Sequence, residues 1–224
     1  MLTVITWLYE AIKDGHRDYR PEHVDRMWHM FAKNYQKPFE LVCFSEQPKE
    51  LFTTPIDVRP LPAHNKGTLK RLWAFSQECA DMFPGKRLFS VDLDVVFTRD
   101  LTVYLDRSEP LVMWTDPMLK KVTYRYAPVF LLDPGTYTDV WDSLAPAKMN
   151  QWYIDTKNKK VGNDMAWLSY YFHGKKMPTF VQHRARLIGD KLPKDAYIVH
   201  FSGTLKPWDA EAMARYPWLA DHVY

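Results

Sequence analysis

The first hundred residues alternate short apolar runs with segments of helical periodicity, and this order most constrains the fold. The runs "LTVITW", "FELVCF", "IDVRPLP" and "KRLFSVDLDVVF" are typical of strands, because they are rich in β-branched and aromatic residues. Between them, "RPEHVDRMWHMFAKNY" and "TLKRLWAFSQECADMF" repeat apolar residues at helical spacing. Strand, helix, strand, strand, helix, strand is an α/β order. We therefore expect a mainly parallel mixed sheet flanked by helices.

Local signals set the expected element boundaries. Pro21 suits the first turn of one helix, Thr68 is a candidate N-cap of the next, and Pro84 with Gly85 ends it. In the less regular second half, "EPLVMWTD", "APVFLLDPGTY" and "AYIVHFSG" predict strands. "YTDVWDSLAPAKM" and "NDMAWLSYYFHG" predict helices, and the tail from Asp209 is helical or irregular.

Composition narrows the class of protein without naming a function. The 224 residues, 46% apolar and 25% charged, suit one globular domain. A formal net charge of +3 neither demands nor excludes a polyanionic partner. Cys43 and Cys79 fit no metal spacing, so we expect reduced, structural thiols. No signal peptide and no bilayer-length apolar run is visible, so we expect an intracellular protein without a transmembrane segment.

Two carboxylates end the apolar run "LFSVDLDVVFTRDL". Alternation in an extended backbone places Asp92 and Asp94 on one side, where together they can ligate Mg²⁺ or Mn²⁺. Such an ion can in turn hold a diphosphate. The alternative is that one aspartate caps a turn and the other is solvated. The apolar residues on both sides of the pair favour the metal interpretation.

A second polar cluster follows the late strand, in "IVHFSGTLKPW". His200 could ligate a metal, Gly203 permits positive φ or a close backbone approach, and Lys206 could neutralise a phosphate. Taken singly, each has a simpler interpretation: a core histidine for His200 and a surface charge for Lys206.

Together, "VDLDVVFTRDL" and "IVHFSGTLKPW" resemble the D-x-D and H-x-x-G-x-x-K-P-W signatures of nucleotide-sugar glycosyltransferases with the GT-A fold. The likeness is closest to glycogenin and related bacterial galactosyltransferases. Weaker likeness to small bacterial and phage glycosyltransferases covers "YRPEHVDRMWHMF", "FELVCFSEQP" and "LKRLWAF". The resemblance implies a single GT-A domain. Residues 1–100 would form the nucleotide-binding half, which ends in D-x-D, and residues 101–224 would bind the acceptor and close over the metal and the diphosphate.

The resemblance also implies roles for individual residues. Asp92, Asp94 and His200 would ligate Mn²⁺ or Mg²⁺, with the histidine favouring Mn²⁺, and Asp92 would also touch the ribose. Gly203 and Lys206 would hold the diphosphate.

The resemblance places further donor contacts near the start of the chain. Either Lys70 or Arg71 would reach the donor. The nucleobase would lie at the end of the first strand, Thr6 to Tyr9, where Trp7 or Tyr9 could stack on it. Core packing is an equally good interpretation of Trp7.

Asp164 matches the acid of a motif that opens a helix beneath the sugar, although Met165 stands where that family often has Gln. Asp164 would be the general base of an inverting enzyme, or would contact the sugar in a retaining one. As a helix N-cap, Asn163 or Asp164 would serve equally well. The mid-chain region departs further from the family pattern, because Ala127 and Pro128 replace small polar residues that contact the donor sugar there. Asp116 and Arg125 are the nearby polar candidates for that contact.

We therefore expect a metal-dependent transferase that uses a nucleotide sugar, a uridine diphosphate sugar above all, in the cytoplasm of a bacterium or of a phage-infected host. The acceptor is a glycan or lipid-linked sugar in one version. In the other it is a 5-hydroxymethylpyrimidine of DNA, supported by the basic-aromatic stretches "MLKKVTYRYAP" and "DTKNKKVGND". Alternatives are a catalytically silent nucleotide-sugar-binding module, or a phosphatase or nucleotidyltransferase that uses D-x-D.

Overall fold

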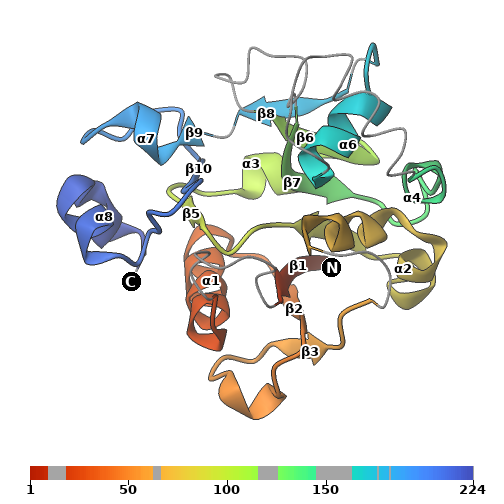
Figure 1. Cartoon of the computed structure of the whole chain (residues 1–224), viewed down its shortest axis with the longest axis horizontal. Coiled ribbons are helices and arrows are strands. Elements are labelled where there is room, and N and C mark those ends of the chain that lie inside the picture. Colours follow the sequence, from red (N-terminus) through yellow and green to blue (C-terminus); the bar gives the residue numbers. More distant parts are fainter. Residues whose placement is uncertain are drawn as a thin grey trace.

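A seven-stranded sheet forms the centre of the molecule, in the order β3-β2-β1-β4-β7-β6-β8 (Figure 1). The computed structural model describes residues 1–9, 19–62, 67–115, 126–144, 163–175, 177–181 and 183–223. The strands are β1 (Leu2–Leu8), β2 (Phe39–Ser45), β3 (Asp57–Arg59), β4 (Arg87–Ser90), β6 (Leu111–Thr115), β7 (Tyr126–Leu132) and β8 (Thr179–Val181).

The sheet is mixed but mainly parallel, as the order of elements predicts. β3, β2, β1 and β4 run parallel to one another, and β8 runs parallel to β6. β7 is antiparallel to both β4 and β6. The carboxyl ends of β2, β1 and β4 consequently meet at one edge, where α/β sheets place their ligands.

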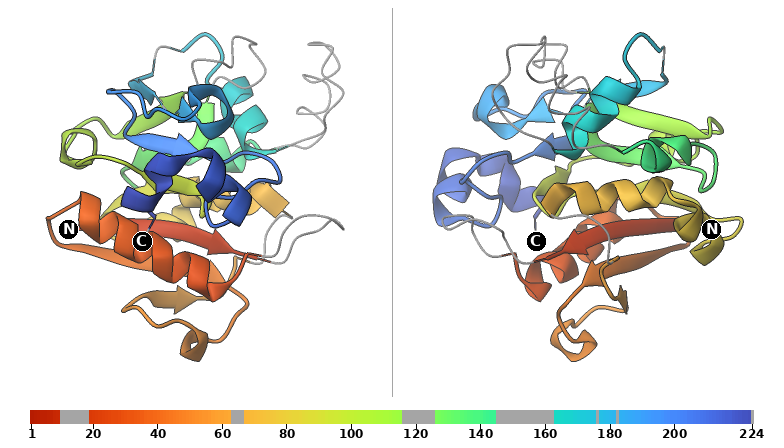
Figure 2. Two further views of the ribbon diagram at one scale, coloured as in Figure 1. Left: turned by 90° about the vertical axis from the view of Figure 1, so that its left-hand side faces the viewer. Right: turned by 45° about the vertical axis from the view of Figure 1, so that its right-hand side comes forward.

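Helical segments cover both faces of this sheet (Figure 2). Helix α1 (Pro21–Asn34) packs Val24, Met27 and Phe31 against one face. The other face is covered through residues such as Trp73 and Trp167. The elements that cover it are η2 (Gly67–Phe75), α2 (Gln77–Met82), α4 (Asp139–Asp142) and α6 (Asp164–Tyr171). None of the helices in the described ranges is long and apolar enough to cross a membrane.

A smaller sheet joins the two halves of the chain. It has the order β5-β10-β9, with β5 (Val95–Phe97) antiparallel to β10 (Ile198–His200) and β9 (His183–Arg184) parallel to β10. In Figure 1 these strands lie between the central sheet and the blue C-terminal segment. The remaining elements are η1 (Lys49–Leu51), α3 (Thr102–Leu105), α7 (Ala185–Ile188), α8 (Ala210–Arg215) and η4 (Pro217–Asp221).

Two predicted elements prove to be divided. The run from 86 to 97 is not one strand: β4 ends at Ser90 and β5 begins in the other sheet, so the two aspartates lie in the connection. The predicted helix over 68–83 is η2 followed by α2, because Ser76, whose hydroxyl accepts from the Cys79 N–H, begins a new helix. Thr68 therefore lies inside η2 and is no N-cap. The short elements β8, β9 and α7 carry no clear sequence signal.

Candidate functional site

The fold gathers the three predicted metal ligands at the join between the two sheets. His200 ends β10 opposite Val95, the first residue of β5, and the Phe201 N–H donates to the Asp94 carbonyl at 2.8 Å. One potential ligand atom from each of Asp92, Asp94 and His200 consequently lies within 4.8 Å of the others. Two carboxylates and an imidazole are a donor set that suits a divalent cation such as Mn²⁺. The residues therefore fit the metal that the sequence predicts.

Asp94 is buried and is held by three donors. Lys206 Nζ lies 2.6 Å from its Oδ2, and the Tyr19 hydroxyl donates to the same oxygen at 3.0 Å. His200 Nε2 lies 3.3 Å from Oδ1. Burial alone would raise the pKa of Asp94, but His200 and Lys206 outweigh burial and hold this pKa well below its usual range. Lys206 is itself buried, which excludes its interpretation as a surface charge.

Arg71 links the D-x-D segment to helix α6. Its guanidinium pairs with Asp92, and its Nε lies 3.0 Å from Asp164 Oδ2. Only 7% of Arg71 and 2% of Asp164 are exposed. Burial raises the pKa of Asp164, and Arg71 limits this rise. Of the two candidates Lys70 and Arg71, the described contacts place Arg71 against this cluster; its contact with a donor stays a prediction.

Helix α6 leaves the Asp164 carboxylate available for this contact. Asn163 is the N-cap, and its side chain accepts from the Ala166 N–H at 2.9 Å. Asp164, the first helical residue, is therefore not needed as the cap. The Thr68 hydroxyl, from η2, hydrogen bonds to it instead.

The segment after His200 is anchored on α1. Gly203 has a φ of +100°, one of the two possibilities that the sequence leaves open for it. Beyond Lys206, the Trp208 ring stacks on His23 with centroids 3.9 Å apart and an interplanar angle of 14°. The Arg26 guanidinium lies 4.1 Å from the Trp208 ring centroid.

Of the three residues at the end of β1 that were predicted to contact the donor, two lie in the core and one lines a cavity. Thr6 donates to the Val91 carbonyl and is fully buried. Trp7 is buried and stacks on Phe44 at 4.7 Å, which is the core interpretation that the sequence left equally open. Tyr9 is half-buried beside Arg71, and burial raises the pKa of its hydroxyl.

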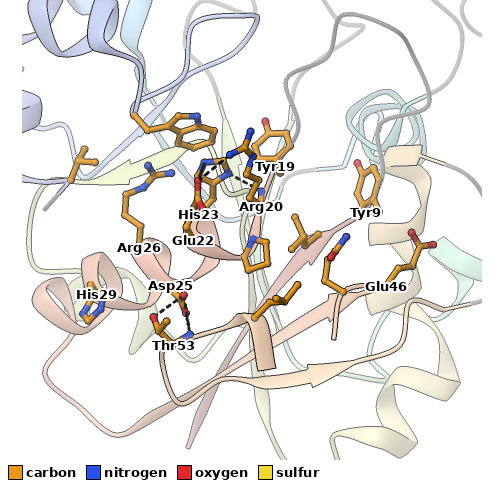
Figure 3. Close-up of a pocket in the computed structure, with 16 residues that line it drawn as sticks. Tyr9, Tyr19, Arg20, Glu22, His23, Asp25, Arg26, His29, Glu46 and Thr53 are labelled. Atoms are coloured by element: carbon orange, nitrogen blue, oxygen red, sulfur yellow. Dashed lines mark hydrogen bonds and ion pairs between the residues drawn. The ribbon is translucent and has the colours of Figure 1, made fainter. Parts of the chain in front are cut away.

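A cavity of about 1190 Å³ opens at the carboxyl ends of β1 and β2, and its lining includes Tyr19, whose hydroxyl contacts Asp94. Figure 3 shows Tyr9 and Glu46 on one side, Tyr19 and His23 on the α1 side, and Thr53 at the base. Tyr19 and Trp208 belong both to this lining and to the surroundings of the cluster. The volume is slightly above the usual range of pockets that hold small molecules or cofactors, so the cavity has room for a ligand of that size.

Sequence reasoning missed Tyr19, Thr68 and His23 as parts of this arrangement. Tyr19 lies 75 residues from Asp94, so no local spacing could have linked them. Asp116 and Arg125 lie outside the described residues, as does most of the two basic-aromatic stretches, and the side chains of Ala127 and Pro128 are not described.

No protein-family model matches the chain, and no curated protein sequence matches it. Solved structures do. The galactosyltransferase LgtC, in complex with donor and acceptor sugar analogues, matches at a TM-score of 0.57 and 12% identity, over 95% of this chain and 91% of that one. An active-site mutant of LgtC matches at a TM-score of 0.58 and 12% identity, over 98% and 95%. The apo form of the glycosyltransferase GlyE from Streptococcus pneumoniae TIGR4 matches at a TM-score of 0.61 and 13% identity. The match covers 93% of this chain and 56% of that one. The chain therefore has the GT-A fold of these glycosyltransferases.

Proposed function

We propose that this protein is a metal-dependent glycosyltransferase that moves a sugar from a uridine diphosphate sugar to an acceptor hydroxyl. The observation that carries the proposal is the convergence of Asp92, Asp94 and His200 within 4.8 Å at the sheet edge. Support comes from the GT-A fold and from Arg71 and Lys206, two cationic side chains in direct contact with this cluster.

In this proposal Asp92, Asp94 and His200 would hold a divalent cation, which would supply positive charge to the diphosphate leaving group. Lys206 and Arg71, which contact Asp94 and Asp92, would supply further positive charge to the leaving group. Gly203 has a φ of +100° that other residues rarely adopt, and this turn would present its backbone to the phosphates. The cavity beside Tyr9 and Tyr19 holds the nucleoside.

Asp164 is the proposed catalytic residue. It begins the helix that packs against η2 and β7, and Arg71 connects it to Asp92. Because burial raises its pKa, its carboxylate is a better proton acceptor than a solvated aspartate. We propose that it faces the transferred sugar and takes the proton of the acceptor hydroxyl.

The test is transfer by the purified protein with Mn²⁺ and a panel of nucleotide sugars, followed by acceptors that include glycans and 5-hydroxymethylated DNA. Asp94→Asn should lower the transfer rate by at least ~100-fold, the usual scale for losing a charge-stabilising group. Turnover of this variant near the wild-type rate would contradict the metal role. Hydrolysis of the donor as the main reaction, with no acceptor modified, would contradict transfer and favour a phosphatase.

A further inference from the structure

The two aspartates of the Asp92–Asp94–His200 cluster are each paired with a cationic side chain of the protein. Lys206 Nζ lies on Asp94 Oδ2 at 2.6 Å and also donates to the Phe201 carbonyl at 3.2 Å. Arg71 pairs with Asp92. Each carboxylate of the D-x-D segment is thus already in contact with one cationic side chain, which offsets the repulsion between half-buried Asp92 and buried Asp94.

These contacts set up a competition. A divalent cation ligated by Asp94 must share or displace the contact that Lys206 makes with the same carboxylate. The ammonium sits on a flexible stem and can leave Asp94 without moving the backbone. It leaves only if another anion receives it, because a buried, unpaired ammonium is costly. A diphosphate provides that anion.

We propose that Lys206 competes with the divalent cation for Asp94, and that the diphosphate relieves this competition by taking Lys206. The inference rests on the proposed use of a nucleotide donor, and it concerns how the binding of metal and the binding of diphosphate depend on each other. Metal alone binds weakly, nucleoside diphosphate alone binds weakly, and the two bind well together. The protein thereby couples loading of the metal to the presence of the donor.

The experiment measures two affinities in wild type and in Lys206→Met, which keeps the apolar stem and removes the charge. Mn²⁺ binding without nucleotide is followed by the electron paramagnetic resonance signal of free Mn²⁺. Lys206→Met should bind Mn²⁺ about tenfold more tightly, the scale of one charge-assisted hydrogen bond. Binding of uridine diphosphate at saturating Mn²⁺ should weaken at least about tenfold. A residue that merely supported the fold would weaken both.

Two further variants serve as controls. Lys206→Arg keeps a charge beside Asp94 and should retain weak Mn²⁺ binding. Lys86→Met makes the same charge change at a lysine paired with Glu40 at 3.3 Å, far from the cluster, and should change neither affinity. If Lys206→Met is unstable, Mn²⁺ should still raise its melting temperature more than that of wild type, because the ion restores the lost neutralisation of Asp94.

The outcomes separate the two proposals. Mn²⁺ binding that is unchanged or weaker in Lys206→Met overturns the competition, whatever the nucleotide does. If wild type binds uridine diphosphate with Mn²⁺ in that case, the proposed function stands. If wild type binds no nucleoside diphosphate in the presence of Mn²⁺, the proposed function and the transfer of Lys206 to the diphosphate both fail.

Discussion

Asp164 differs from Asp94 in the balance between burial and neighbouring charges. Asp94 faces two cationic or imidazole partners that outweigh burial, whereas burial dominates at Asp164 and raises its pKa. A carboxylate of raised pKa that is paired with Arg71 suits proton transfer better than metal ligation.

Asp164→Asn should therefore lower the transfer rate by about 100-fold or more and change the affinity for Mn²⁺ and uridine diphosphate less than about threefold. Steady-state rates and calorimetric titration of the same preparation test this. Asp133→Asn is the matched control, since Asp133 also pairs with an arginine, Arg87, but at the opposite end of β4. An equal loss of nucleotide affinity in Asp164→Asn would contradict the assignment.

His23 gives a second prediction, on stability. Its Nδ1 accepts from the Arg20 N–H at 2.9 Å, and its ring is covered by Trp208. Burial, with Arg26 and Arg20 nearby, lowers the pKa of His23 to about 4. As the pH falls, the imidazole of His23 becomes protonated near pH 6.5 in the unfolded chain but only near pH 4 in the folded one. The free energy of unfolding should therefore decrease as the pH falls through this window, by roughly 2–3 kcal/mol from this residue.

Urea unfolding at several pH values checks the sign. His23→Gln keeps a hydrogen-bond acceptor but cannot titrate, so its stability should decrease less than that of wild type between pH 6.5 and 4. Parallel pH profiles in the two proteins would show that His23 does not contribute in this way.

At the scale of elements, two helix N-caps offer a matched comparison. Asn163 caps α6 and precedes Asp164, while Ser76 caps α2, which contributes no residue to the cluster. Asn163→Ala and Ser76→Ala should each lower the free energy of unfolding by about 1 kcal/mol. Only Asn163→Ala should also slow transfer, because the first turn of α6 positions Asp164 beside Arg71.

Denaturant unfolding and transfer rates of the two variants provide the measurement. Equal effects on the transfer rate would mean that the position of Asp164 does not depend on the start of α6.

Among the strands and helices, those with strong local signals could be predicted from the sequence. Strands with strong apolar runs, such as β1 and β2, and the amphipathic helix α1 carry their signals locally and are predicted well. The divided run at Ser90 is not, because its residues stay apolar while the chain passes from one sheet to the other. Period-two alternation therefore predicted the proximity of Asp92 and Asp94 for the wrong reason, because Leu93 and Asp94 lie in a turn and not in an extended strand. Their approach also depends on the pairing of β5 with β10.

At the scale of the whole molecule, the site is a product of topology. The Arg71 guanidinium, Asp92 and Asp94, Asp164, and the segment from His200 to Trp208 come from four separate parts of the chain. Motif spacing located Lys206 and the three residues that could hold a metal, because residue type and strand ends are local features. Contacts such as Tyr19 with Asp94 and Trp208 with His23 depend on long-range packing, so they required the fold.

The central claim is that Asp92, Asp94 and His200 hold a divalent cation that binds the diphosphate of the donor. Calorimetric titration of uridine diphosphate into wild type and Asp94→Asn, each with and without Mn²⁺, tests it most directly. Wild type should bind uridine diphosphate at least about tenfold more tightly with Mn²⁺, and Asp94→Asn should lose that gain. Nucleotide affinity that is independent of both Mn²⁺ and Asp94 would contradict it.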